Sequence, residues 1–256
     1  MLGTYRGKGD TVTHGTQHFQ RARSPEQRET RRRAILDAAA AMMTEMPVAD
    51  ISLRELSRRV GLAKSNVLRY FESREEVFLE LLDAGWTEWL AALGRELEAL
   101  PSLPSLPVGR PADSVQTTNR VDAIAQAMAR SLADRPLLCE LASVTANVLE
   151  RNVSVPVARR FKIAAMNSMA VLQELLRDHL PGLDEPSAEQ FTAATLVMVA
   201  GLWPLANPPS TVLAAYEDPT LAAARVGFED GLRAFLTAQL TGVLHGGARS
   251  APRPSY

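Results

Sequence analysis

The chain has 256 residues, of which 46% are hydrophobic and 22% are charged. These values are ordinary for globular proteins, so they argue against widespread disorder and allow one or two domains with a sizeable core. The formal net charge of −1 excludes a basic coat over the whole chain. The single cysteine, Cys139, excludes an intrachain disulfide and a cysteine-based zinc site.

The apolar segments do not have the form of a secretory signal or a membrane span. The amino-terminal residues lack the apolar core of a signal sequence. The most apolar run, Phe191–Ala206, is shorter than the roughly 20 residues that cross a bilayer, and Gly201 and Pro204 interrupt it. We therefore expect a cytoplasmic protein with no membrane partner.

The chain begins with an arm and a first helix. Residues 1–23 have no hydrophobic periodicity and predict a flexible basic arm. Ser24-Pro25 marks the start of a helix that should run to about Glu45. The predicted apolar side of this helix consists of Ile35, Ala38, Ala39 and Met42.

Residues 51–74 carry the most informative pattern. Ser52-Leu-Arg-Glu55 is a capping box that opens a short helix, and Gly61 suits the left-handed residue that ends it. A second short helix should span about 63–71. The apolar faces that would pack together comprise Leu53, Leu56 and Val60 on the first helix and Val67 and Phe71 on the second. This packing predicts a helix-turn-helix, although an ordinary helical hairpin with a polar outer face fits the spacing as well.

The rest of the chain is a series of helical patterns almost without strand signals. Ser73-Arg-Glu-Glu76 opens a long helix with leucines to Leu100, and the proline-rich segment 101–111 interrupts it. Further helices are predicted near 113–133, 135–151, 155–179, 187–206 and 219–244. Pro204 should break or kink the fourth of these helices.

The charge is unevenly distributed over an all-α chain. Residues 1–74 carry 14 basic and 8 acidic side chains, a net charge of +6, so residues 75–256 carry −7. We predict five segments: the arm 1–23, a DNA-binding domain 24–82, a connecting helix and loop 83–111, a helical domain 112–245 and a flexible tail 246–256.

Three segments in series resemble one family of proteins. ILDAAAAMM, SLRELSRRVG and LAKSNVLRYFESREEVF resemble the first three helices and the start of the connecting helix of the TetR (tetracycline-repressor-like) family of bacterial transcription regulators. The resemblance covers roughly Gln27–Leu82. It implies a sequence-specific DNA-binding regulator with a helix-turn-helix domain and a larger helical domain, most often a repressor that a small effector releases from its operator.

The resemblance also implies which residues face DNA. The implied DNA-binding set is Ser52, Arg54, Lys64, Ser65, Asn66, Leu68, Arg69, Tyr70 and Arg74. Beside this set, Arg21, Arg23 or Arg28 could reach the adjacent minor groove, although a solvated tail fits the amino-terminal residues as well. Two positions depart from the family pattern. Ala63 stands where a capping Ser is common, so the second helix loses a cap worth about 1 kcal/mol. Leu68 stands where an aromatic residue is usual, which replaces a phosphate-bonding hydroxyl by an apolar group that suits a thymine methyl.

The larger domain should hold the effector and the dimer contacts. The resemblance implies a homodimer formed through the last two long helices and an effector site inside the domain. For an apolar or aromatic effector, the candidate residues are Met128, Cys139, Asn147, Met166, Met169, Met198 and Trp203. For any single one of these residues, the role of a filler in an ordinary core fits the sequence better. Cys139 could sense oxidants if it were exposed, but its leucine-rich flanks favour burial.

Two other classes of function compete with a regulator. An enzyme would need a catalytic or phosphate-binding motif, and the chain contains no G-x-S-x-G, Walker loop or G-x-G-x-x-G. His14 and His18 have ligand-like spacing but no third ligand, so we expect no metal and no cofactor. A helical adaptor would use the helix-turn-helix for protein contacts only. A basic potential over Arg54, Lys64, Arg69 and Arg74 would favour DNA instead.

Overall fold

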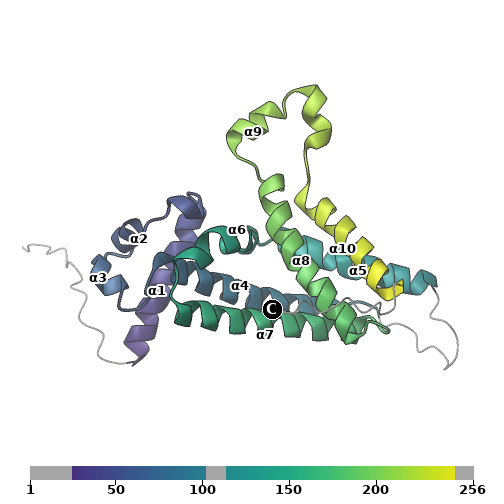
Figure 1. Cartoon of the computed structure of the whole chain (residues 1–256), viewed down its shortest axis with the longest axis horizontal. Helices are drawn as coiled ribbons and strands as arrows, with labels where there is room; N and C mark the ends of the chain where they lie inside the picture. Colours follow the sequence, from purple (N-terminus) through teal and green to yellow (C-terminus); the bar gives the residue numbers. More distant parts are fainter. Residues whose placement is uncertain (1–24, 102–113, 246–256) are drawn as a thin grey trace, which may run out of the picture.

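The computed structural model describes residues 25–101 and 114–245, and within these ranges the chain is helical and has no β-strand (Figure 1). The predicted all-α fold is confirmed. The helices are α1 (Pro25–Met43), α2 (Leu53–Arg59), α3 (Lys64–Val67), α4 (Arg74–Glu98), α5 (Ser114–Ala133), α6 (Pro136–Val144), α7 (Val155–His179), α8 (Glu185–Ala206), α9 (Ser210–Ala215) and α10 (Phe228–His245). Short 3₁₀ or π-helical turns lie at Val48–Asp50 (η1), Thr145–Leu149 (η2), Glu150–Asn152 (η3) and Pro219–Ala224 (η4).

The long helix α4 belongs to both halves of the molecule. Its first turns pack against α1, and the rest of it lies beside α5, α6 and α7 (Figure 1). The leucines that the sequence places along one side, among them Leu82, Leu93 and Leu97, are buried. Trp89 is also fully buried, and its indole Nε1 donates a hydrogen bond of 2.9 Å to Ser131 Oγ on α5. This contact satisfies the polar atom that would otherwise be costly to bury.

A second layer consists of α5, α8 and α10. Helix α10 packs against both α5 and α8 through Leu232, Leu236 and Leu240, which are fully buried. The rings of Trp203 on α8 and Phe228 on α10 meet edge to face with centroids 4.9 Å apart. The carboxyl end of α8 and the amino end of α10 are therefore adjacent.

The predicted helix starts are largely confirmed. Ser52 caps α2 by accepting a hydrogen bond from the Glu55 backbone N–H at 3.1 Å, and Ser73 caps α4 in the same way through Glu76 N–H at 3.2 Å. Gly61 has a φ of +67°, the left-handed conformation that favours glycine. The helix predicted at 155–179 has these bounds in the structure.

The last two long helices differ from the prediction. Helix α8 begins at Glu185, two residues before the predicted start at 187, because Asp184 is its cap: Asp184 Oδ1 accepts the Ser187 N–H at 2.9 Å. It also continues past Pro204 and ends at Ala206, so Pro204 does not break it.

The single helix predicted over 219–244 is wrong. The chain forms η4 at 219–224, an extended stretch, and α10 only from Phe228. Alanines in 219–224 have high helix propensity, but all six residues are exposed, and Gly227 interrupts the pattern before the buried face begins.

Several predicted segments lie outside the described residues. These are the arm 1–23 with Arg21 and Arg23, the cap Ser24, most of the proline-rich loop, and the tail from 246. Among the helices that are described, none is both long and apolar enough to cross a membrane.

We predict that Cys139 does not react with thiol reagents in the folded protein. Its side chain is fully buried, its Sγ lies 3.3 Å from the Leu132 carbonyl, and burial raises the pKa of the thiol to about 12. The reactive thiolate is therefore scarce at neutral and mildly alkaline pH. Titration with Ellman's reagent should show almost no reaction in buffer and one full equivalent in denaturant. Rapid reaction of the folded protein would contradict this burial and reopen an oxidant-sensing role.

Candidate nucleic-acid interface

The helix-turn-helix consists of α2, a tight turn at Gly61 and α3. Leu56, Val67 and Phe71 are buried, as their predicted packing requires, and Ile51 before the α2 cap is buried with them. The Leu62 backbone N–H donates to the Ser57 carbonyl at 3.0 Å, which closes the turn. This packing directs the opposite sides of both helices to solvent.

Helix α3 is shorter than predicted. It covers Lys64–Val67 rather than 63–71, and residues 68–71 continue as tight turns, with Tyr70 N–H bonded to the Val67 carbonyl at 2.9 Å. Ala63 provides no side-chain cap, which agrees with the predicted departure from the family pattern. A four-residue helix without a cap depends on the packing of Val67 and Phe71 for its position.

The predicted DNA-binding residues lie together around this motif. The exposed members of the set are Ser52, Arg54, Lys64, Ser65, Asn66, Leu68 and Arg69. Leu68 is 42% exposed, a high value for a large apolar side chain. Tyr70 is half-buried and packs against the core. The hydroxyl of Ser52 accepts the Glu55 N–H, so its proton remains available to an external acceptor.

The basic side chains of the motif divide into two groups. Arg58 pairs with Glu55, and Arg59 pairs with Glu45, which lies just after α1. The hydrogen bond from Arg59 holds the pKa of Glu45 below its usual value. By contrast Arg54, Lys64 and Arg69 are exposed and make no ion pair with any residue that the structure describes.

Arg32 fixes the position of the turn that follows α3. It projects from α1, and its Nη1 donates a hydrogen bond of 3.1 Å to the Tyr70 carbonyl. Its Nε and Nη2 bond to the Glu80 carboxylate on α4, and the guanidinium lies 4.5 Å from the centre of the Phe71 ring. Sequence reasoning missed this role because the partners lie 38 and 48 positions away, beyond the reach of any local pattern.

Arg74 fixes the start of the motif. Its Nη1 donates to the carbonyls of Val48, Ala49 and Ile51 at 3.4, 3.0 and 2.6 Å, and its Nε bonds to Glu75 at 2.9 Å. These carbonyls belong to η1 and to the residue before the Ser52 cap. The structure thus places the guanidinium of Arg74, which the family resemblance assigns to DNA, against the protein's own backbone.

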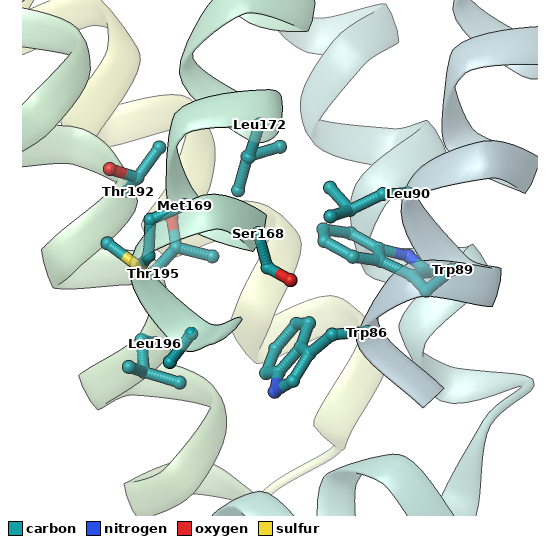
Figure 2. A pocket seen from close by; sticks show the side chains of 10 residues that line it. Trp86, Trp89, Leu90, Ser168, Met169, Leu172, Thr192, Thr195 and Leu196 are labelled. Carbon is teal, nitrogen blue, oxygen red and sulfur yellow. The ribbon is translucent and has the colours of Figure 1, made fainter. Parts of the chain in front are cut away.

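A cavity in the larger domain lies between α4, α7 and α8 (Figure 2). The cavity encloses about 50 Å³ and is partly open to solvent. Its walls are Trp86, Trp89, Leu90, Ala165, Ser168, Met169, Leu172, Thr192, Thr195 and Leu196. The hydroxyls of Thr192 and Thr195 donate hydrogen bonds to the carbonyls of Glu189 and Phe191 within α8.

Only Met169 among the predicted effector residues lines this cavity. The other candidates lie elsewhere: Met128 and Cys139 are in the core, Met166 and Asn147 are exposed, Met198 packs at the edge of the core, and Trp203 is buried. The indole Nε1 of Trp203 donates to Glu140 Oε2 at 2.9 Å, which commits it to the contact between α8 and α6. The prediction chose effector residues by residue type alone, so it included methionines from every face of the helices. Trp86 and Trp89 were missed, although their spacing of three places them on one face of α4.

We predict that Arg74→Ala destabilises the fold. Three backbone carbonyls lose a charged donor and the buried Glu75 loses its partner, so the free energy of unfolding should fall by about 1–3 kcal/mol. Urea unfolding at fixed protein concentration measures this change. Arg69→Ala, which removes the same charge from an unpaired and exposed position, should change stability by less than about 0.5 kcal/mol. Equal stability of the two variants would rule out the bracing role of Arg74.

Comparison with known proteins gives two family matches that together span most of the chain. Residues 35–81 match the model of bacterial regulatory proteins of the tetR family, and residues 83–247 match the tetracyclin repressor-like C-terminal domain. An uncharacterised HTH-type transcriptional regulator from Haemophilus influenzae is 38% identical over 58 residues, which is 22% of this chain and 28% of that protein's length.

Solved structures share the fold at low sequence identity. A protein from Pseudomonas aeruginosa PAO1, named as a transcriptional regulator, has a TM-score of 0.51 and 15% identity over 85% of this chain and 92% of its own. A TetR-family protein from Syntrophomonas wolfei has a TM-score of 0.50 and 12% identity over 87% of this chain and 99% of its own. With both halves matched by family models, the chain belongs to the TetR family of transcriptional regulators.

Proposed function

We propose that this regulator is a dimeric repressor that binds an operator through α2 and α3 and leaves it when a small apolar or aromatic effector binds. The observation that carries the DNA contact is the unpaired state of Arg54, Lys64 and Arg69. A cation without an internal partner keeps its charge for phosphate, whereas Arg58 and Arg59 are already neutralised by carboxylates. The basic residues of the motif are therefore not expected to contribute equally to DNA binding.

The polar side chains of α3 are suited to reading bases. Ser65 and Asn66 are exposed beside Lys64, and an amide can pair with adenine in the major groove. The exposed Leu68 offers an apolar contact to a thymine methyl. We assign Lys64 and Asn66 to sequence discrimination and Arg54 and Arg69 to phosphate. Arg74 is assigned to bracing the motif, because its guanidinium is committed to backbone carbonyls.

The dimer contact is proposed along α8 and α10. On α8 the exposed residues Ala193, Val197, Gly201 and Leu205 recur every four positions, and on α10 Ala234, Ala238 and Gly242 do the same. Val197 is 72% exposed. Apolar stripes of this kind on a single chain are typical of interfaces, and small residues allow helices to approach closely. A two-fold dimer would place two recognition helices about 34–36 Å apart, one turn of DNA.

The cavity supports an effector with an apolar body and one polar group. Its walls are indole, aliphatic and thioether surfaces, which favour an apolar or aromatic ligand. Ser168 points into the space near Trp86 and Trp89 (Figure 2), and its hydroxyl has no partner among the residues that the structure describes. A ligand with a hydrogen-bonding group facing Ser168 satisfies that hydroxyl.

Helix α7 provides a route from the cavity to the DNA-binding domain. Its middle lines the cavity, and its first turns contact the connection between α3 and α4: Ser154 Oγ bonds to Glu72 Oε2 at 2.6 Å and Arg160 Nη2 to Glu76 Oε1 at 2.6 Å. Glu76 also accepts the Glu72 backbone N–H at 2.5 Å. A ligand that favours a shifted α7 would therefore favour a different position of α3, which is a population shift between two dimer geometries.

We predict two kinds of DNA-binding defect. Arg54→Ala and Arg69→Ala should weaken binding to specific and random DNA alike and reduce the salt slope by about 1 each, because each removes one phosphate contact. Lys64→Ala and Asn66→Ala should lower discrimination by about 1–3 kcal/mol. Fluorescence polarisation at several salt concentrations, with the region upstream of the chain's own gene and an unrelated DNA, measures both.

The matched control for these charge changes is Arg177→Ala at the far end of α7, which should leave the salt slope unchanged. Uniform loss on both DNAs for all four variants would contradict the division of roles. If the unaltered protein bound operator-containing DNA and unrelated DNA equally weakly, the proposed function would be overturned.

We predict that Ser168→Phe abolishes the response to effectors while DNA binding persists. The phenyl ring of the substituted side chain would occupy the space between Trp86 and Met169 that the ligand needs. Tryptophan fluorescence reports binding, because two indoles line the space, and polarisation reports release of DNA. Met166→Phe is the control, since Met166 is 71% exposed on the same helix. Retained ligand binding in Ser168→Phe would place the effector site elsewhere.

We predict that Arg160→Ala separates ligand binding from DNA release. The loss of the Arg160–Glu76 ion pair leaves the cavity and the DNA surface intact, so both affinities should stay within about twofold while ligand-induced release weakens by about tenfold. The adjacent Arg159, exposed and without an ion pair among the residues described, is the control in Arg159→Ala. Undiminished release in Arg160→Ala would exclude α7 as the route.

A further inference from the structure

The connection between α8 and α10 is much longer than its ends require. Trp203 and Phe228 are in ring contact, so the two helix ends are already adjacent. Such ends are commonly joined by about 4–6 residues. Here residues 208–227 form a long connection that stands clear of the body of the molecule (Figure 1). In this subsection, 'the arm' means these residues and not the amino-terminal residues 1–23.

The arm has local structure but no packing of its own. It consists of α9 and the 3₁₀ turn η4, and neither makes an extensive contact with another helix. Its hydrogen bonds are local, such as those from the Thr220 N–H and hydroxyl to Asp218 Oδ1 at 2.8 and 2.7 Å. Helices of six residues are not stable alone in water, so these turns need a surface to pack against.

The arm exposes apolar side chains that a surface could bury. Val212 and Leu213 on α9 and Leu221 on η4 are each about two-fifths exposed. Pro208, Pro209 and Pro219 restrict the backbone of the arm. Because a restricted arm loses little freedom when it docks, it suits a binding role rather than a passive linker.

We propose that the arm clasps a second copy of this chain. It begins where the exposed stripe of α8 ends, at Leu205, which is 60% exposed, so its apolar side chains continue the surface assigned above to the dimer. In a two-fold dimer each arm would reach the partner, and the contact would form twice. This inference rests on the proposed dimer and adds a second contact region to it.

The charge of the arm argues for a protein partner over a lipid one. Glu217 and Asp218 lie side by side between its two helical turns, and both are exposed. Acidic side chains at this position are repelled by anionic membranes, whereas a protein surface can pair with them. Binding to vesicles is therefore an outcome that would count against the clasp.

The test shortens the arm in the full-length chain. Residues 208–226 are replaced by about five Gly and Ser residues, which the adjacent helix ends allow. Sedimentation equilibrium should show a dimer dissociation constant at least about tenfold higher than that of the unaltered chain, with helical circular dichroism of the body retained. An unchanged dissociation constant overturns the clasp and leaves the α8–α10 dimer standing.

Point variants keep the inference testable if the shortened chain fails to fold. Leu213→Asp together with Leu221→Asp should weaken the dimer, and Thr211→Asp, an exposed polar position on the same arm, should not. Equal weakening by both would overturn the clasp. Val197→Asp on α8 tests the underlying dimer separately: if the unaltered chain is itself monomeric, the proposed dimer fails and the clasp with it.

A probe on the arm reports contact directly. In Leu213→Cys a nitroxide label attaches selectively, because Cys139 is fully buried. The label should be immobilised in the dimer and mobile in the Val197→Asp background. The same spectrum in both, or immobilisation only on addition of anionic phospholipid vesicles, overturns the proposal.

Discussion

Three carboxylates on the first two turns of α4 determine how the DNA-binding segment is held. Glu75 and Glu76 are buried and Glu80 is half-buried, and buried carboxylates need charged partners. Arg74 pairs with Glu75 and holds the residues before α2, while Arg32 pairs with Glu80 and holds the carbonyl that follows α3. The motif is therefore fixed at both ends to one rigid helix.

This arrangement explains why only some of the basic side chains on the motif are free of internal partners. Arginines whose charges are used internally set the shape of the motif, and the charges left over face solvent on α2 and around α3. A surface built in this way can meet phosphate without losing the contacts that position it. It also explains how a short, uncapped recognition helix can present Ser65 and Asn66 in a defined orientation, because Val67 and Phe71 beneath them are buried.

The same helix joins DNA binding to the larger domain. Trp86 and Trp89 of α4 form one wall of the cavity, and α7 forms another wall before it reaches Glu72 and Glu76 with its first turns. Two helices, α4 and α7, therefore connect the cavity to the DNA-binding domain. On the far side, α8 completes the cavity and also carries the stripe proposed for the dimer, so the proposed ligand would lie beside helices that lead to the DNA-binding residues and to the dimer contact.

The sequence by itself determined most of the helices and the starts of α2 and α4, because capping boxes, Gly61 and apolar periodicity act over a few residues. It also determined the family, since the motif is local. The tertiary structure decided which charges are free: Arg32, Arg74 and Arg69 look alike in sequence, and partners far along the chain separate them. It likewise decided the cavity, which forms where three distant helices meet, and the course of residues 219–227, because the helix propensity of the alanines in 219–224 could not create a surface for them to pack on.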